Sequence, residues 1–181
     1  MRQSVEQRKA KAYLANQFGF YDEGRDLVLP YIKQRMEEIG IQVLEPFEEC
    51  KKQLLLPPKR LSKSYDAREY YYAQRNHQIA AINRDCMRQA DLLTPLLDGG
   101  HTLDEGVVDE MAFYAGLHKG PIIAHRSDSR LCENMAGRIN SMVEETILSS
   151  GGVLVVGEHS LEEWLNVIRF WYERFFRQSH F

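Results

Sequence analysis

The chain has 181 residues, of which 44% are hydrophobic and 27% are charged, and its formal net charge is −3. These values are typical of a globular protein, and the length suits one domain with a well-packed core. The slightly acidic balance argues against general nucleic-acid binding, which depends on a basic surface.

The N-terminal segment and the cysteines bear on the cellular location of the protein. The opening MRQSVEQRKAKAYL has no apolar signal region. No apolar run approaches the roughly 18 residues that are needed to cross a bilayer. Cys50, Cys86 and Cys132 are odd in number and widely spaced, which favours free thiols over disulfides or a zinc site. We therefore expect a cytoplasmic protein without a membrane segment, a metal or a cofactor.

The first quarter of the chain predicts a strand, a helix and a second strand. Residues 12–15 are expected to form the first strand, followed by an irregular turn. Apolar residues at helical spacing over 28–39 predict a helix that Gly40 ends as a C-cap. Residues 41–44 predict the second strand, which Pro46 stops.

The next segments predict a surface excursion, a long helix and a buried strand. Residues 48–64 mix charges, leucines and prolines, which is typical of a surface segment or lid. Residues 65–89 have a predominantly helical pattern. Residues 92–97 predict the third strand, although Pro95 counts against it because proline cannot donate to a ladder.

The remaining segments continue the alternation of helix and strand. A helix follows the loop after the third strand, with apolar positions at Val108 and Met111. Further strands are expected over 122–125 and 153–156, separated by a helix over 133–148. A final helix begins at Ser160, with acidic residues in its first turn.

This alternation predicts an α/β fold. We expect a single domain over residues 1–181, with a flavodoxin/Rossmann-like three-layer fold around a five-stranded parallel sheet. The aromatic C-terminal helix, residues 160–178, is apolar on more than one face, so we expect it to contribute oligomer contacts.

An acidic loop follows the third predicted strand. Ligands of open α/β sheets bind at the carboxyl ends of the strands, where this chain carries Asp98, Asp104 and Glu110. Gly106 gives the backbone room to bring two carboxylates to one cavity. One could act as nucleophile while the other manages a proton, as in retaining glycosidases. The same spacing also fits a capping Asp104 and a solvated acidic helix start.

A series of short motifs surrounds this loop and runs in one order over roughly residues 12–165. The motifs are Tyr13-Leu14-Ala15, GIQVLEPFE over 40–48, Ala90-Asp91, Leu97-Asp98-Gly99, Asp104-Glu105-Gly106, Glu110, Ala112, Lys119, Pro121-Ile122, Asn140-Ser141-Met142 and Ser150-Gly151-Gly152. In this order they resemble the pattern of the nucleoside 2-deoxyribosyltransferase family.

The resemblance implies a set of residue roles. Glu110 would attack C1′ of a 2′-deoxynucleoside, Asp104 would handle the proton at the nucleobase, and Tyr13 would orient the Glu110 carboxylate. Asn140 would enter the active site of a neighbouring subunit and hold the 5′-hydroxyl, which implies a homo-oligomer, a dimer or larger. The further substrate contacts implied are Asn83, Asp98, Gly106, Met142, Phe18 and Phe20.

Three positions depart from the family pattern. Asn16-Gln17 replaces the usual Gly-Pro after the first strand, and Val107 replaces a threonine. Asn83 stands where an aspartate is frequent, and an amide can donate and accept hydrogen bonds but cannot act as a general base. The proton transfer then falls to Asp104.

The sequence thus predicts an enzyme that cleaves the N-glycosidic bond of 2′-deoxynucleosides through a covalent glycosyl-Glu110 intermediate and transfers deoxyribose to another nucleobase. Its partners would be small nucleosides and nucleobases. Two alternatives remain open. One is a hydrolase of a nucleoside or of a deoxynucleoside 5′-monophosphate, and the other is a non-catalytic nucleotide-binding domain of the same fold.

Overall fold

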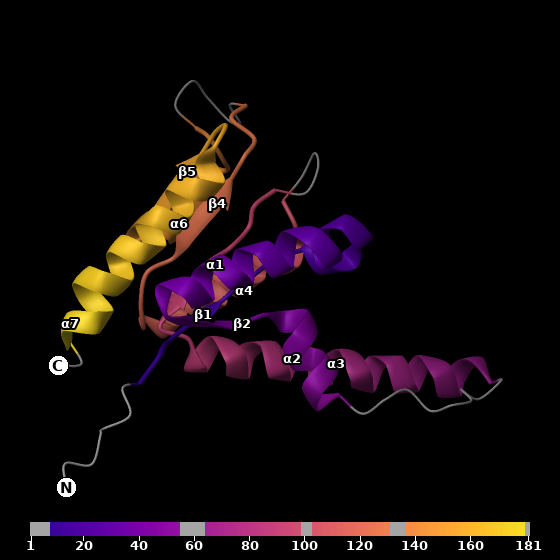
Figure 1. The fold of residues 1–181 in the computed structure, drawn as a ribbon. Helices are drawn as coiled ribbons and strands as arrows, with labels where there is room; N and C mark the ends of the chain where they lie inside the picture. Colours follow the sequence, from indigo (N-terminus) through magenta and orange to yellow (C-terminus); the bar gives the residue numbers. More distant parts are fainter. Residues whose placement is uncertain (1–7, 55–63, 99–102, 131–136, 180–181) are drawn as a thin grey trace, which may run out of the picture.

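A computed structural model describes residues 8–54, 64–98, 103–130 and 137–179. All strand pairs in this part of the chain are parallel and the strands alternate with helices (Figure 1), so the predicted α/β class is confirmed. The strands are β1 (Ala10–Tyr13), β2 (Ile41–Leu44), β3 (Leu92–Leu93), β4 (Ile123–Arg126) and β5 (Val153–Val156).

The α-helices occupy most of the segments between and after the strands. They are α1 (Leu29–Ile39), α2 (Pro46–Gln53), α3 (Tyr65–Gln89), α4 (Glu105–Leu117), α5 (Ser141–Ser149), α6 (Ser160–Trp171) and α7 (Arg177–Ser179). Short helical turns of other types are η1 (Phe18–Phe20), η2 (Gly24–Val28) and η3 (Tyr172–Phe176).

The described strands form two sheets rather than the predicted single five-stranded sheet. One is three-stranded with the order β2-β1-β3, and the other joins β4 to β5. Within the described residues, the two sheets are connected by isolated parallel bridges, Leu93 to Ile122 and Leu96 to His125. The third strand, predicted over 92–97, is interrupted because Pro95 has no N–H to donate, although its carbonyl accepts a bond from His125 N at 3.0 Å. The flavodoxin-like strand layout therefore stays a prediction.

The boundaries of the other strands lie at or within two residues of those predicted from the sequence pattern. The predicted strands 41–44 and 153–156 are confirmed without a shift. The first strand begins at Ala10, two residues before the predicted 12–15, because its ladder with β2 starts at the pair Ala10–Ile41. The fourth strand ends at Arg126, one residue beyond the predicted 122–125.

The predictions for two further segments, 48–64 and 133–148, were wrong in part. The predicted surface excursion 48–64 begins as helix α2, because Glu45 caps it by accepting a bond from Glu48 N at 2.8 Å and Pro46 occupies its first turn. Residues 55–63 lie outside the described residues. Within the predicted helix 133–148, residues 137–140 are not helical and α5 starts at Ser141 with Asn140 as its N-cap, while residues 131–136 lie outside the described part.

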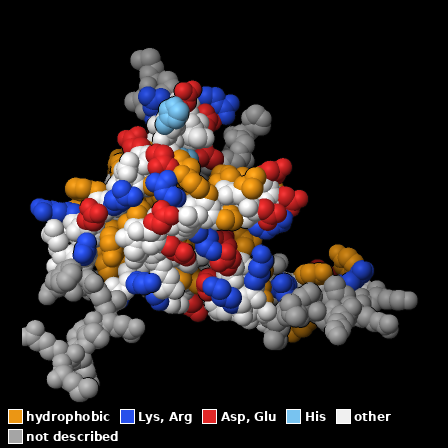
Figure 2. Space-filling model, viewed as in Figure 1, with side chains coloured by type: hydrophobic (Ala, Val, Ile, Leu, Met, Phe, Trp, Pro, Cys, Tyr) orange, Lys and Arg blue, Asp and Glu red, His pale blue; other side chains and the backbone are white. Residues whose placement is uncertain are grey.

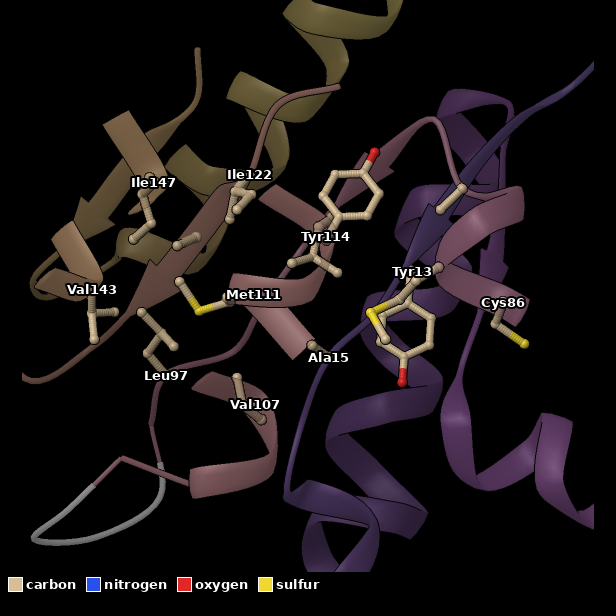
Figure 3. Close-up of a cluster of buried hydrophobic side chains, with 14 of the residues drawn as sticks. Tyr13, Ala15, Cys86, Leu97, Val107, Met111, Tyr114, Ile122, Val143 and Ile147 are labelled. Carbon is tan, nitrogen blue, oxygen red and sulfur yellow. The ribbon is translucent and has the colours of Figure 1, made fainter. Parts of the chain in front are cut away.

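The interior contains two apolar clusters. The first joins β1 and β3 to α3, α4 and α5, and Figure 3 shows Met111 and Tyr114 of α4 in this cluster with Val143 and Ile147 of α5. The second packs α1 and α6 against the strands around the fully buried Trp164. Tyr13 belongs to the first cluster and is fully buried, so packing alone fixes the orientation of its ring, independently of the contact that its hydroxyl makes.

The C-terminal aromatic residues divide between core and surface. Trp164 and Phe176 are buried in the second cluster, whereas Phe170 and Phe175 are more than half exposed. The proposed oligomer contacts of this helix therefore concern its exposed face alone. Helix α3 extends away from the body of the molecule (Figure 1), and Figure 2 shows hydrophobic side chains near its outer end, where Tyr65 and Tyr70 are exposed. None of the described helices combines the length and apolarity that a bilayer span requires.

Candidate active site

The Glu110 carboxylate is held by two donors from different elements. Tyr13, the last residue of β1, donates its hydroxyl hydrogen to Glu110 Oε1 at 2.6 Å. Asn83 of α3 donates from Nδ2 to the same oxygen at 3.1 Å. Because both donors bind Oε1, they fix the plane of the carboxylate and leave Oε2 as the oxygen for a reaction.

The amide of Asn83 is oriented from its other end. Cys50 Sγ of α2 lies 3.7 Å from Asn83 Oδ1 in a thiol hydrogen bond. The amide oxygen therefore faces Cys50 while the amide nitrogen faces Glu110. Asn83 thus binds the Glu110 carboxylate, and the substrate contact that the resemblance implies for Asn83 stays a prediction.

Burial raises the pKa of both members of the Tyr13–Glu110 pair. Burial raises the pKa of Glu110 to about 7, and the hydrogen bonds from Tyr13 and Asn83 limit this rise by favouring the charged form. Burial and the Glu110 carboxylate raise the pKa of Tyr13 far above its usual range, so its hydroxyl remains a neutral donor. A carboxyl with a pKa near neutral pH is a characteristic of functional sites.

Glu110 lies on the wall of a cavity of about 650 Å³, which is within the size range of small-molecule sites. The cavity is walled by α2, α3, the first turn of α4 and the loop after β1. Its lining comprises Asn16, Phe20, Pro46, Phe47, Cys50, Lys51, Leu54, Arg75, Asn76, Ile79, Asn83, Asp104, Gly106, Val107 and Glu110. A hollow of about 320 Å³ adjoins it and shares Asn83 and Glu110.

Asp104 and Gly106 place a second carboxylate on the same wall. Asp104 is the N-cap of α4, and its Oδ1 accepts a hydrogen bond from Val107 N at 2.9 Å. A Cβ at position 106 would lie 3.0 Å from that oxygen, so glycine leaves room for the capping carboxylate. Both interpretations of Asp104 are thus compatible, because the residue caps the helix and lines the cavity.

Asp98 lies in a separate polar network at the end of β4. Its Oδ1 accepts bonds from Ser127 N at 2.7 Å and Ser127 Oγ at 2.8 Å, and its Oδ2 lies 3.0 Å from His125 Nδ1. Burial alone would raise the pKa of Asp98, but the bonds from His125 and Ser127 outweigh it and hold the pKa below its ordinary value. Asp98 is outside the described lining of the cavity.

The network continues from His125 to Ser160, whose Oγ lies 2.9 Å from His125 Nε2. The order Asp98–His125–Ser160 is that of a hydrolase triad. Ser160, however, is only 2% exposed, so a substrate cannot reach its hydroxyl. We interpret this chain of side chains as structural.

The other residues implied by the resemblance occupy different surroundings. Phe20 lines the cavity and makes an edge-to-face contact with Phe47 at 4.8 Å between ring centroids. Phe18 packs beside the second apolar cluster and contacts Tyr21. Asn140 and Met142 lie exposed at the start of α5, outside the described lining of this cavity.

Several lining residues were not anticipated. Phe47, Lys51 and Arg75 of α2 and α3 were assigned no part in the site. The capping signature Glu45-Pro46 would have revealed α2. The spacing of Arg75, Ile79 and Asn83 along one helix face would have placed Arg75 beside the site.

Within the described ranges, no group of three His, Cys, Asp or Glu side chains could hold a metal ion. The fold and the site together define an α/β protein with a small-molecule cavity built around a partly buried, oriented carboxylate.

Comparison with known proteins assigns the chain more closely. A family model described as nucleoside 2-deoxyribosyltransferase matches residues 12–150, and the chain belongs to this family. A search of curated protein sequences gave no match.

Solved structures share the fold at low sequence identity. A conserved protein from Enterococcus faecalis V583 is 19% identical with a TM-score of 0.59, covering 89% of this chain and 99% of that one. A 2-desoxiribosyltransferase from Leishmania mexicana is 16% identical with a TM-score of 0.53, covering 74% and 85%. A CMP N-glycosidase from Clostridium botulinum is 12% identical with a TM-score of 0.54, covering 87% and 97%.

Proposed function

We propose that the chain cleaves the N-glycosidic bond of 2′-deoxynucleosides through a covalent intermediate on Glu110 and transfers the sugar to a second nucleobase. One observation carries this proposal: a carboxylate held by Tyr13 and Asn83 on a cavity wall that also carries Asp104. Family membership supports the reaction class.

In the first step, Glu110 Oε2 forms a bond to C1′ as the bond from C1′ to the base nitrogen breaks. The electron pair of the broken bond leaves with the base, which takes a proton from Asp104. The anionic carboxylate stabilises the positive charge that develops at the sugar. Because Asp104 Oδ1 caps α4, its second oxygen is the one that carries the proton.

In the second step, a nitrogen of the incoming base attacks C1′ and displaces the Glu110 carboxylate. The proton that this nitrogen loses returns to Asp104. Water is the competing acceptor, and its use would make the protein a hydrolase. Addition of a free acceptor base distinguishes the two outcomes, since a transferase forms the new nucleoside and a hydrolase releases sugar at a rate that ignores the base.

Intact mass spectrometry after exposure to 2′-deoxynucleosides tests the covalent step. We expect a deoxyribosyl adduct on the wild-type chain that Glu110→Ala abolishes. Glu105→Ala is the matched control, because Glu105 is an exposed acid in the first turn of the same helix, and this variant should keep the adduct. An adduct that persists in Glu110→Ala would refute the assignment. Nucleoside binding without turnover by the wild type would favour the non-catalytic alternative.

We also propose that a neighbouring subunit completes the site with Asn140 and Met142. Met142 is 74% exposed, and both residues lie apart from the cavity lining of their own chain. Asn140→Ser keeps an N-cap oxygen for α5 while shortening the side chain. If Asn140 acts between subunits, mixing inactive Asn140→Ser with inactive Glu110→Ala should restore part of the activity, because some mixed sites contain both native residues. Mixing without any recovery would reject the shared site.

We further propose that the two sheets form one layer, with the carboxyl ends of all described strands at one edge. The isolated bridges between β3 and β4 support this view. It places the Glu110 cavity and the Asp98 network at neighbouring strand ends, where a flavodoxin-like order would bring them.

A further inference from the structure

The amide of Asn83 connects helix α2 to the reacting carboxylate. Asn83 Nδ2 donates to Glu110 Oε1 at 3.1 Å, and Asn83 Oδ1 accepts a bond from Cys50 Sγ at 3.7 Å. Cys50 lies on α2, Asn83 on α3 and Glu110 on α4, and all three residues line the cavity. A single amide group therefore joins the thiol to the carboxylate.

The orientation of this amide decides whether it supports the carboxylate. An amide side chain has two orientations of similar shape, which exchange its oxygen and its nitrogen. In the reversed orientation, Asn83 Oδ1 would face Glu110 Oε1, and two acceptors would repel each other. The amide nitrogen would then face the sulfur of Cys50, which is a weak acceptor. The observed orientation satisfies both ends of the amide.

Glu110 alone does not fix this orientation at all times. The pKa of Glu110 is about 7, so near neutral pH a large share of the molecules carries a protonated carboxyl, which selects the amide nitrogen less strictly. A substrate in the cavity also brings acceptor atoms that compete for Asn83 Nδ2. A donor at the opposite end of the amide acts in both situations, and the Cys50 thiol is this donor.

Helix α2 is anchored, so its thiol has a defined position. Glu45 is 2% exposed and caps α2 by accepting a bond from Glu48 N at 2.8 Å. Asn16 Nδ2 donates to the other oxygen of Glu45 at 3.1 Å. Asn16 follows the strand β1, which ends with Tyr13, the second donor to the reacting carboxylate. The helix that carries the thiol and the strand that carries the phenol are thus held together.

The Cys50 thiol is kept as a neutral donor. Burial raises the pKa of this thiol, and nearby carboxylates raise it further, while Arg75 opposes them. These carboxylates belong to Glu45, Glu49 and Glu110. A raised pKa makes a cysteine a poor nucleophile, because the thiolate is the reactive form. The contact with the amide and the acidity of the thiol therefore both suit hydrogen-bond donation.

On the basis of the proposed function, we propose that Cys50 is a positioning residue whose thiol holds the Asn83 amide in the orientation that donates to the Glu110 carboxylate. Without the thiol, the amide turns away from Glu110 part of the time, and the carboxylate loses a donor that favours its charged, nucleophilic form. Asp104 and Asp109 also act on Glu110 by raising its pKa, and a substitution at position 50 leaves both residues in place.

The pH dependence of kcat/KM for a 2′-deoxynucleoside tests this role. For Cys50→Ala, we expect the rise of activity with pH to move upwards by about half a pH unit, so that kcat/KM at about pH 6 falls about three-fold. Cys50→Ser keeps a donor in the form of a hydroxyl group, and its profile should match that of wild type. Gln53→Ala is the control, because Gln53 is exposed on the same helix and is outside the described cavity lining. An unmoved profile in Cys50→Ala, or an equal movement in Cys50→Ser, would overturn the proposal.

A double-mutant cycle tests whether Cys50 acts through Asn83. In the Asn83→Ala background, Cys50→Ala should move the profile no further, because the amide that the thiol positions is absent. Thermal unfolding of each variant shows that it is folded at the assay temperature. Equal movements in both backgrounds would mean that the thiol acts directly on the carboxylate or the substrate, and the positioning role would be wrong.

Titration of the Glu110 carboxyl by carbon NMR needs no turnover, and Glu110→Gln identifies its signal. Cys50→Ala should raise the pKa of Glu110 above its wild-type value. If the wild type turns over no nucleoside and Cys50→Ala still raises this pKa, the proposed function alone is refuted. If the wild type turns over nucleosides and Cys50→Ala leaves this pKa unchanged, the positioning role alone is refuted.

Discussion

Two polar networks at the strand ends use similar residues to opposite effect. In the first, Glu110 receives bonds from Tyr13 and Asn83 on one oxygen and faces a cavity, and its pKa is raised to about 7. In the second, Asp98 Oδ1 accepts two hydrogen bonds from Ser127, Asp98 Oδ2 lies 3.0 Å from His125 Nδ1, and the pKa of Asp98 is lowered. A carboxylate whose hydrogen bonds outweigh its desolvation stabilises the fold, whereas one whose desolvation outweighs its hydrogen bonds is held ready for chemistry at a cost in stability.

The largest expected effect comes from neutralising the first carboxylate. Glu110→Gln should lower turnover by about 10³-fold or more, because the amide cannot attack C1′.

Glu110→Gln should also stabilise the folded protein above neutral pH. The pKa of Glu110 is higher in the folded chain than in the unfolded chain, so the folded state binds the additional proton and wild-type stability falls as the pH rises from about 4.5 to about 7.

Denaturant unfolding at about pH 5 and about pH 8 checks this sign. The stability of Glu110→Gln relative to wild type should increase by up to about 3 kcal/mol between these conditions. A relative stability that decreases towards high pH would show that the Glu110 carboxylate is stabilised by its surroundings, and the contrast between the networks would fail.

The next effect concerns the second network. Asp98→Asn should destabilise the fold by about 2–3 kcal/mol at neutral pH, because charge-assisted bonds are lost and an amide hydrogen comes to face His125. The lowered pKa means that this stabilisation is present above the unfolded pKa and is lost as pH falls through the folded one. The difference between variant and wild type should therefore shrink in acid, as measured by denaturant unfolding.

Activity measurements on Asp98→Asn decide its role. We expect kcat/KM within about three-fold of wild type, as for a residue outside the cavity that acts through stability alone. A much larger loss in a folded variant would instead support the substrate contact that the family resemblance implies.

A smaller effect is expected when the nucleophile loses its strongest donor. Tyr13→Phe removes the 2.6 Å bond that favours the charged form of Glu110, so the pKa of Glu110 should rise further. At neutral pH kcat/KM should fall about ten-fold, and the rise of activity with pH should move to higher pH. Asn83→Ala should shift the profile in the same direction by less, since its bond is longer. An unshifted pH profile in Tyr13→Phe would contradict the orienting role.

The first network was largely predictable from sequence, whereas the second was not. The spacing of Asp104, Gly106 and Glu110 after a strand, with Tyr13 ending another, placed these side chains together through local pattern and family motif. The pairing of His125 with Ser160 joins residues 35 positions apart on a strand and a helix, and no periodicity reports such a contact. Arg75 was missed because α2, which lines the cavity together with α3, was taken for a surface segment.

The smallest expected effect tests whether the two networks are independent. Ser160→Ala removes the partner of His125 Nε2 but leaves the contact of His125 with Asp98 in place. The loss of one buried hydrogen bond should cost about 1 kcal/mol and lower Tm by about 2–4 °C. Turnover and its pH profile should stay those of wild type, because Glu110 and Tyr13 share no hydrogen bond with this network in the described part of the chain. Calorimetry and steady-state kinetics on one preparation measure both quantities. A shift in the activity profile without loss of Tm would show that the second network acts on the reacting carboxylate, and the division between structural and functional carboxylates would have to be abandoned.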